Sequence, residues 1–106
     1  MITYEDFKKI DLRVAAVKSV EPHPNADKLM ILKVDLGDEE RQLVAGIKQW
    51  YEPEQLVGKN IVIVANLEPA ELRGTKSNGM LLAAQAGDDV VVLTTDKDIA
   101  AGAKVH

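Results

Sequence analysis

The residues with the most evident chemistry lie in one polar stretch between Asn66 and Gly79. The stretch offers two cations, Arg73 and Lys76, among the hydroxyl and amide side chains of Asn66, Thr75, Ser77 and Asn78. Such groups are the ones that proteins use to bind phosphate and ribose oxygens. The stretch contains no nucleophile beside a base, and a small domain would not keep so long a loop merely as a connector. It therefore predicts a binding site for phosphates and ribose.

A second polar turn, residues 22–28, is rich in proline, asparagine and aspartate, which favour turns. As a binding loop, it would offer the side-chain amide of Asn25 for hydrogen bonding and the cation of Lys28 for a phosphate. Asp27 would fix the loop instead, because a carboxylate is repelled by phosphate. From the residues alone, an ordinary turn is an equally good interpretation. His23 is not expected to bind a metal, since His106 is the only other histidine and the chain has no cysteine.

The hydrophobic pattern predicts short strands and two short helices. Thr3 and Asp6 form a capping-box pair, which predicts a helix over 4–9. The alternation that starts at Leu12 changes phase after Val17, which predicts a bulged strand. Further strands are predicted over 30–36, 42–45, 61–65, 80–84, 90–93 and 103–105, with a second helix over 53–57.

Five strands with a short helix after the third match the plan of an OB-fold, a small, partly open barrel. In that plan, the loop between strands 1 and 2 and the loop between strands 4 and 5 flank the ligand groove. Those loops are the two polar segments, 22–28 and 66–79. The chain is therefore predicted to be one all-β domain, residues 1–106, with a barrel over roughly 10–85. Residues 86–106 and the N-terminal helix are predicted to form a homodimer interface, because a five-stranded barrel has no internal use for them.

Composition excludes several kinds of function. Thirteen basic and 17 acidic residues give a net charge of −4, so any nucleic-acid binding must come from a local patch. The four aromatic residues, Tyr4, Phe7, Trp50 and Tyr51, lie off the predicted barrel strands, which argues against stacking of successive bases as in single-strand binders. The chain has no long apolar run, an acidic start and no cysteine, which suits a cytoplasmic protein. No catalytic site, metal site or cofactor is predicted.

Several segments together carry a resemblance to a known family. They are residues 11–14 (DLRV), 23–29 (HPNADKL), 34–37 (VDLG), 44–47 (VAGI) and 66–84. In these residues the chain closely resembles the tRNA-binding domain family, found free-standing and as the C-terminal domain or beta subunit of methionyl-tRNA synthetase. The resemblance implies an OB-fold that binds the outer corner of folded tRNA by shape, without sequence specificity. It also implies a homodimer, and a module that raises the tRNA affinity of a synthetase.

With the resemblance, a set of candidate tRNA-binding residues can be named. They are Asn25, Lys28, Lys33, Asn66, Arg73, Lys76, Ser77, Asn78 and Met80. Roles without RNA contact stay open for several of them. Lys33 could simply be exposed to solvent, and Asn66 could only hydrogen-bond the backbone of its own loop. Met80 could pack in the core, and Arg73 could form an ion pair with Glu68 or Glu71. Relatives tend to carry Lys or Arg where this chain has Glu68, Ala70 and Glu71, so weaker and more salt-sensitive tRNA binding is expected.

A different class of function also fits the predicted fold. The CsaA proteins, which are secretion-related chaperones, share the fold and the dimer, and the acidic net charge and apolar strand edges of this chain favour a protein-binding role slightly. The run from His23 to Lys28 and the Ser77-Asn78-Gly79-Met80 segment favour tRNA instead.

Overall fold

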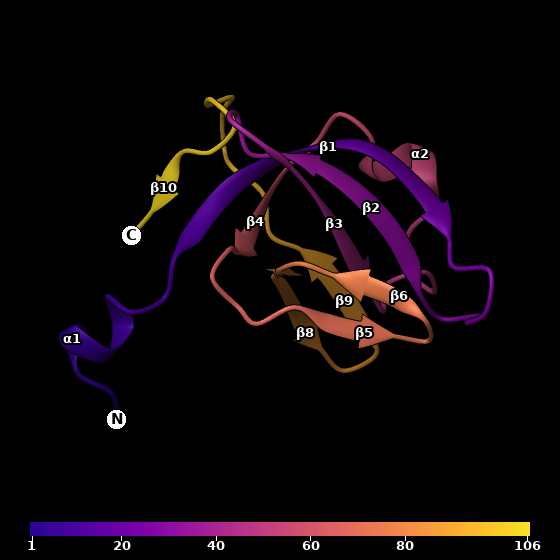
Figure 1. Cartoon of the computed structure of the whole chain (residues 1–106), viewed down its shortest axis with the longest axis horizontal. Coiled ribbons are helices and arrows are strands. Elements are labelled where there is room, and N and C mark those ends of the chain that lie inside the picture. Colours follow the sequence, from indigo (N-terminus) through magenta and orange to yellow (C-terminus); the bar gives the residue numbers. More distant parts are fainter.

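The computed structural model describes residues 1–106, and antiparallel strands are its main regular structure. The main sheet has six strands; five lie in the spatial order β3-β2-β1-β4-β7, and the sixth, β10 (Lys104–Val105), pairs with β1 outside this order. The five are β1 (Leu12–Pro22), β2 (Met30–Asp35), β3 (Glu40–Ala45), β4 (Asn60–Val64) and β7 (Met80–Leu81). The sheet curls around a shared core into an OB-like barrel (Figure 1), which confirms the predicted all-β class.

Strand β1 is long enough to serve two parts of the barrel. Its first half, Leu12 to Ala16, pairs with β4, and its second half, Ala16 to Pro22, pairs with β2. The register shifts between Val17 and Ser19. The predicted bulge is therefore confirmed, and it lets one strand bend from one neighbour to the other.

The core is aliphatic, and each of the five strands β1, β2, β3, β4 and β7 contributes to it. Its largest fully buried side chains are Met30, Leu32, Leu43, Leu56, Ile61 and Ile63. Each such side chain contributes about 1.5–3 kcal/mol by leaving water. Strand β4 is buried on both faces, as its continuous apolar sequence predicts. The short helix α2 (Pro53–Leu56) starts on a proline, ends before Gly58, and buries Leu56 in this core.

The predicted loop over 66–79 contains a hairpin, which the sequence pattern did not predict. Strands β5 (Ala70–Leu72) and β6 (Thr75–Ser77) pair with each other around a two-residue turn. Both turn residues, Arg73 and Gly74, have positive φ angles of 55° and 87°. That backbone is the type I′ turn, which matches the twist of the paired strands and usually carries asparagine or aspartate before the glycine.

The C-terminal third is joined to the barrel by further pairings. Strand β8 (Ala83–Ala86) pairs with β9 (Asp89–Val92), and the two-residue strand β10 (Lys104–Val105) pairs with the start of β1. The strands after residue 82 therefore pair within the chain. The reason given above for a dimer, that the barrel has no internal use for these strands, is thus wrong. A role of residues 86–106 in a dimer stays a prediction.

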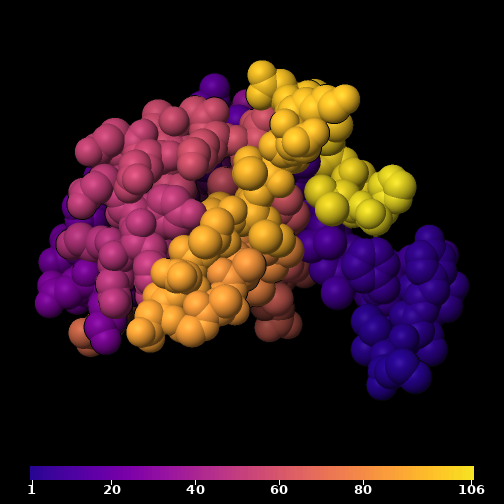
Figure 2. All heavy atoms as spheres, turned by 180° about the vertical axis from the view of Figure 1, so that it is seen from behind, coloured from indigo at the N-terminus to yellow at the C-terminus, as the bar shows by residue number.

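The N-terminal residues form an arm that stands off the barrel, and it is visible in indigo in Figures 1 and 2. Helix α1 (Tyr4–Phe7) is shorter than the predicted 4–9 and has no buried residue. The predicted capping box is confirmed: Asp6 N donates to Thr3 Oγ1 at 3.1 Å, and Thr3 N donates to Asp6 Oδ2 at 3.3 Å. No helix in the structure has the length and apolar character that a bilayer crossing needs.

Candidate nucleic-acid interface

The β1–β2 turn and the β5–β6 turn lie against each other, although they are about fifty residues apart in sequence. Lys28 of the first turn and Arg73 of the second line the same cleft, of about 380 Å³, together with Ala26, Asp27 and Leu29. Lys28 and Arg73 are both exposed. The two polar segments predicted to flank a ligand groove are thus adjacent in the fold.

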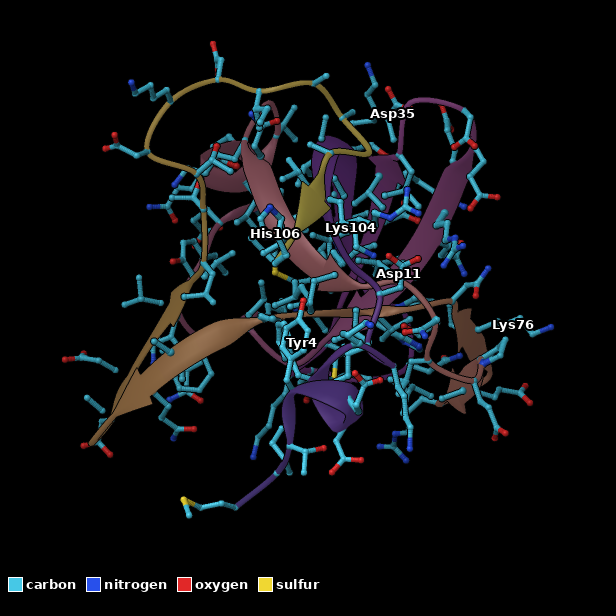
Figure 3. All side chains as sticks on the ribbon, turned by 90° about the vertical axis from the view of Figure 1, so that its left-hand side faces the viewer. Tyr4, Asp11, Asp35, Lys76, Lys104 and His106 are labelled. Carbon is cyan, nitrogen blue, oxygen red and sulfur yellow. The ribbon has the colours of Figure 1, made fainter.

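Two more cations are linked to this region through Gln42 of β3. Lys33 Nζ on β2 donates to Gln42 Oε1 at 2.6 Å, and Gln42 Nε2 donates to the carbonyl of Lys76 on β6 at 2.8 Å. Lys33 is the only exposed residue of β2. In Figure 3 the side chain of Lys76 points out into solvent, away from the body of the barrel.

Lys28, Lys33, Arg73 and Lys76 are called the cationic surface below. Two carboxylates lie close to it: Asp27 lines the cleft, and Glu71 sits directly opposite Lys76 across the hairpin. Residues directly opposite on neighbouring strands have their Cβ atoms about 4.5–5.5 Å apart, so Glu71 offsets part of the charge of Lys76. Arg73 forms no ion pair. The alternative in which Arg73 pairs with Glu68 or Glu71 therefore finds no support.

The side chain of Ser77 is buried, unlike that of an exposed residue that could contact RNA. Its side chain is only 4% exposed, and its hydroxyl accepts from Val44 N at 2.9 Å and donates to the Gly79 carbonyl at 3.0 Å. Asn78, which is half-buried, donates its backbone N–H to Gln42 O at 2.8 Å. These bonds fasten the hairpin to β3. Ser77 therefore holds the cationic surface in place, and its hydroxyl hydrogen is already used within the protein.

Asn66 is also occupied by the protein itself. Its Oδ1 accepts from Asp11 N at 2.8 Å and its Nδ2 donates to Lys9 O at 2.7 Å. The side chain thus ties the end of β4 to the N-terminal arm. The alternative in which Asn66 only tethers backbone fits these bonds, although the backbone it tethers is the arm and not its own loop.

Asp11 and Arg13 form an ion pair beside the C-terminal turn. Arg13 Nε donates to Asp11 Oδ1 at 2.7 Å, and Arg13 Nη1 donates to Gly102 O at 3.3 Å. The hydrogen bond to Asp11, together with its charge, raises the pKa of Arg13 above its usual value. These residues of the DLRV segment thus join the start of β1 to the chain end rather than to the cationic surface.

An apolar groove lies on the other side of the hairpin. Its volume is about 370 Å³, and its walls include Leu67, Ala70, Leu72, Met80 and Ala83. Met80 is 46% exposed and belongs to this groove rather than to the core. Asn25 is exposed beside the cleft.

Two residues of the site were missed in the candidate set. Gln42 bridges Lys33 and Lys76, and its position opposite Lys33 follows only from the β2–β3 register. His23 is 4% exposed, and its ring forms one hydrogen bond within the first turn, to Asn25, and one to the second turn, at Leu72. Nothing in the spacing of residues 23–29 identifies Leu72 as its partner. No group of three or more histidine, aspartate or glutamate side chains lies close enough together to hold a metal ion.

Comparisons with known proteins identify the family of this chain. The family model described as "Putative tRNA binding domain" matches residues 12–104. Methionine–tRNA ligase from Pyrococcus horikoshii is 58% identical over 105 residues, which is 99% of this chain and 14% of the ligase. This chain thus spans about one seventh of the length of that relative.

Solved structures are similar over the whole chain. A MetRS related protein from Pyrococcus horikoshii superimposes with a TM-score of 0.95 at 36% identity, covering 100% of this chain and 98% of that one. The chaperone CsaA from Bacillus anthracis gives a TM-score of 0.91 at 33% identity, covering 100% and 99%. The protein is therefore a member of the tRNA-binding domain family, similar to a segment of methionine–tRNA ligase.

Proposed function

We propose that this chain binds folded tRNA at its outer corner without sequence specificity, either free-standing or as a module that raises the tRNA affinity of methionyl-tRNA synthetase in the cytoplasm. The observation that carries the proposal is the cationic surface, in which two turns and two strands bring four exposed cations together on a protein of net charge −4. A local patch of this kind can hold phosphates even when the whole protein is acidic.

The aromatic residues support a folded RNA rather than an unstructured strand. Trp50 Nε1 donates to the Asp88 carbonyl at 2.7 Å, and the Tyr51 hydroxyl accepts from Val92 N at 3.0 Å. Both rings are half-buried, and neither lies on the cationic surface. Without a row of exposed rings on which successive bases can stack, recognition through backbone, ribose and shape is favoured.

Binding of folded tRNA is expected to exceed binding of an unstructured RNA of equal length at least tenfold. Its affinity should fall with salt with a slope of log K against log salt of about −3 to −3.5, because each of four neutralised phosphates contributes about −0.7 to −0.9. The measurement is a mobility-shift or anisotropy titration between 50 and 300 mM KCl. Equal affinity for both RNAs would contradict the proposal.

We also propose that the N-terminal arm docks on a second copy of this chain. The arm exposes Met1, Ile2, Tyr4 and Ile10, whose exposed fractions are 126%, 69%, 71% and 39%. A four-residue helix with no buried side chain gains little stability of its own in water. A cavity of about 160 Å³ lies between the arm and the C-terminal strand, and its lining joins Tyr4, Phe7, Ile10 and Val105 with Lys8, Lys104 and His106. Figure 3 shows the labelled side chains of Tyr4 and His106 at this end of the molecule.

Asn66→Ala is expected to weaken the dimer at least tenfold, because it removes both hydrogen bonds that set the direction of the arm. The measurement is sedimentation or light scattering across a concentration series. Asn78→Ala is the matched control, since this asparagine lies in the same segment and its side chain makes no bond to the arm. A wild-type protein that is monomeric at micromolar concentration would overturn the dimer itself.

A second candidate function is the binding of an unfolded peptide, the kind of role that a chaperone such as CsaA performs, and the apolar groove favours it. Strands β5 and β8 beside the groove each pair on one edge only. The segments 66–72 and 80–93 that flank it carry Glu68, Glu71, Asp88 and Asp89 and no cation. This groove suits an extended segment with apolar and basic side chains.

The two candidate functions predict opposite effects of two substitutions. Suppression of the aggregation of an unfolded client, lost in Met80→Glu and unaffected by Lys28→Ala, would favour the peptide-binding role. A tRNA shift with the reverse sensitivity favours the first proposal.

A further inference from the structure

His23 makes the hydrogen bond that joins the two turns of the cationic surface. The ring is buried between them: Nδ1 accepts from the Asn25 N–H at 3.0 Å, and Nε2 lies 3.0 Å from the Leu72 carbonyl oxygen. No other hydrogen bond connects residues 23–29 with residues 66–79. Arg73 directly follows Leu72, Lys28 lies three residues after Asn25, and both line the cleft between the turns.

The partners fix the protonation state of the ring. A backbone N–H can only donate and a carbonyl oxygen can only accept, so Nδ1 must be bare and Nε2 must carry the hydrogen. A proton on Nδ1 would place two N–H donors against each other and break the bond to Asn25. It would also put a positive charge on a ring that is 4% exposed.

None of the ion pairs in the structure includes His23. The bridge between the turns is therefore the hydrogen bond from Nε2–H to the Leu72 carbonyl, and the bond from the Asn25 N–H to Nδ1 orients the ring for it.

We propose that His23 is a positioning residue for tRNA: its neutral Nε2 tautomer holds the β1–β2 turn and the β5–β6 turn in one binding surface. This inference depends on the proposed function. It predicts that affinity for folded tRNA depends on a hydrogen-bond donor at the position of Nε2, facing the Leu72 carbonyl.

The test uses two variants that imitate different halves of the ring. His23→Asn keeps an acceptor for the Asn25 N–H, as in an Asx turn, and lacks an atom that reaches Leu72. His23→Gln carries an amide N–H at the reach of Nε2 and does not titrate. His106→Gln removes the other imidazole and serves as the control.

Affinity for folded tRNA is measured at pH 7.5 and constant ionic strength. Wild type, His106→Gln and His23→Gln are expected to bind alike, and His23→Asn to bind about five- to tenfold more weakly, because it lacks the donor to Leu72. Unchanged binding by His23→Asn, or a loss in His23→Gln as large as in His23→Asn, would overturn the proposal. Melting temperatures separate these outcomes from a loss of fold.

A readout without RNA keeps this inference distinct from the proposed function. Long-range ¹⁵N–¹H spectra of His23 at pH 7.5 are expected to show the neutral Nε2–H tautomer. The neutral Nδ1–H tautomer, which has no hydrogen on Nε2, would refute the bridge even if tRNA binds. The expected tautomer in a protein that fails to bind tRNA would uphold the bridge and reject only the proposed function.

Discussion

Gly102→Ala is expected to lower the free energy of unfolding by about 3–5 kcal/mol, a large share of the roughly 5–15 kcal/mol that is typical of a small domain. A Cβ at position 102 would lie 2.2 Å from the Leu36 carbonyl oxygen, and Gly102 has a φ of +89°. The clash is with backbone, so a change of rotamer cannot relieve it. Urea or thermal unfolding measures the effect.

Gly58→Ala is the matched control for this substitution. Its φ of +88° is nearly the same, and a Cβ there would meet nothing within 4 Å. It should cost only the backbone penalty of about 1–2 kcal/mol. If both variants lose the same stability, then the contact between Gly102 and the β2–β3 turn is not what constrains this position.

The second large effect is expected from removing the cationic surface as a whole. The variant Lys28→Gln, Lys33→Gln, Arg73→Asn, Lys76→Gln should bind folded tRNA about 1,000-fold more weakly at 0.1 M salt, since each phosphate contact is worth nearly tenfold there. Its salt dependence should become almost flat. Asparagine is chosen at position 73 because it tolerates the positive φ of the turn. Isothermal titration or anisotropy gives both quantities.

Charge by itself must be controlled in that experiment. Four exposed lysines outside the cationic surface, Lys18, Lys48, Lys59 and Lys97, can be changed to glutamine together. Either variant moves the formal net charge from −4 to −8, because four cations are removed. A similar loss of affinity in the control would show that tRNA senses only the overall charge.

The parts of this fold that local rules determine could be predicted from the sequence. The Thr3 capping box, the bulge after Val17 and the helix that starts at Pro53 each depend on a few neighbouring residues, and the structure confirms them. The adjacency of the two polar turns followed from the OB-fold plan, which places their loops at one end of the barrel.

The parts that depend on long-range contacts could not be predicted in this way. The β5–β6 hairpin was missed because Arg73 occupies a left-handed turn position where asparagine or aspartate is usual. Ser77 and Asn66 are polar loop residues, as binding residues often are, and only the fold reveals that Val44, Gly79, Asp11 and Lys9 use their hydrogen bonds. Polar type alone does not separate a ligand contact from a support.

The arm and the β5–β6 turn lie toward opposite ends of the molecule's longest axis (Figure 1). Two chains joined through their arms would thus direct their RNA-facing ends outward. Such a pair would hold two tRNA molecules, one per protomer, and could not close on one corner from both sides. Dimerisation would then not raise the avidity for a single tRNA. It would instead raise the local concentration of tRNA around the dimer and around any chain joined to it.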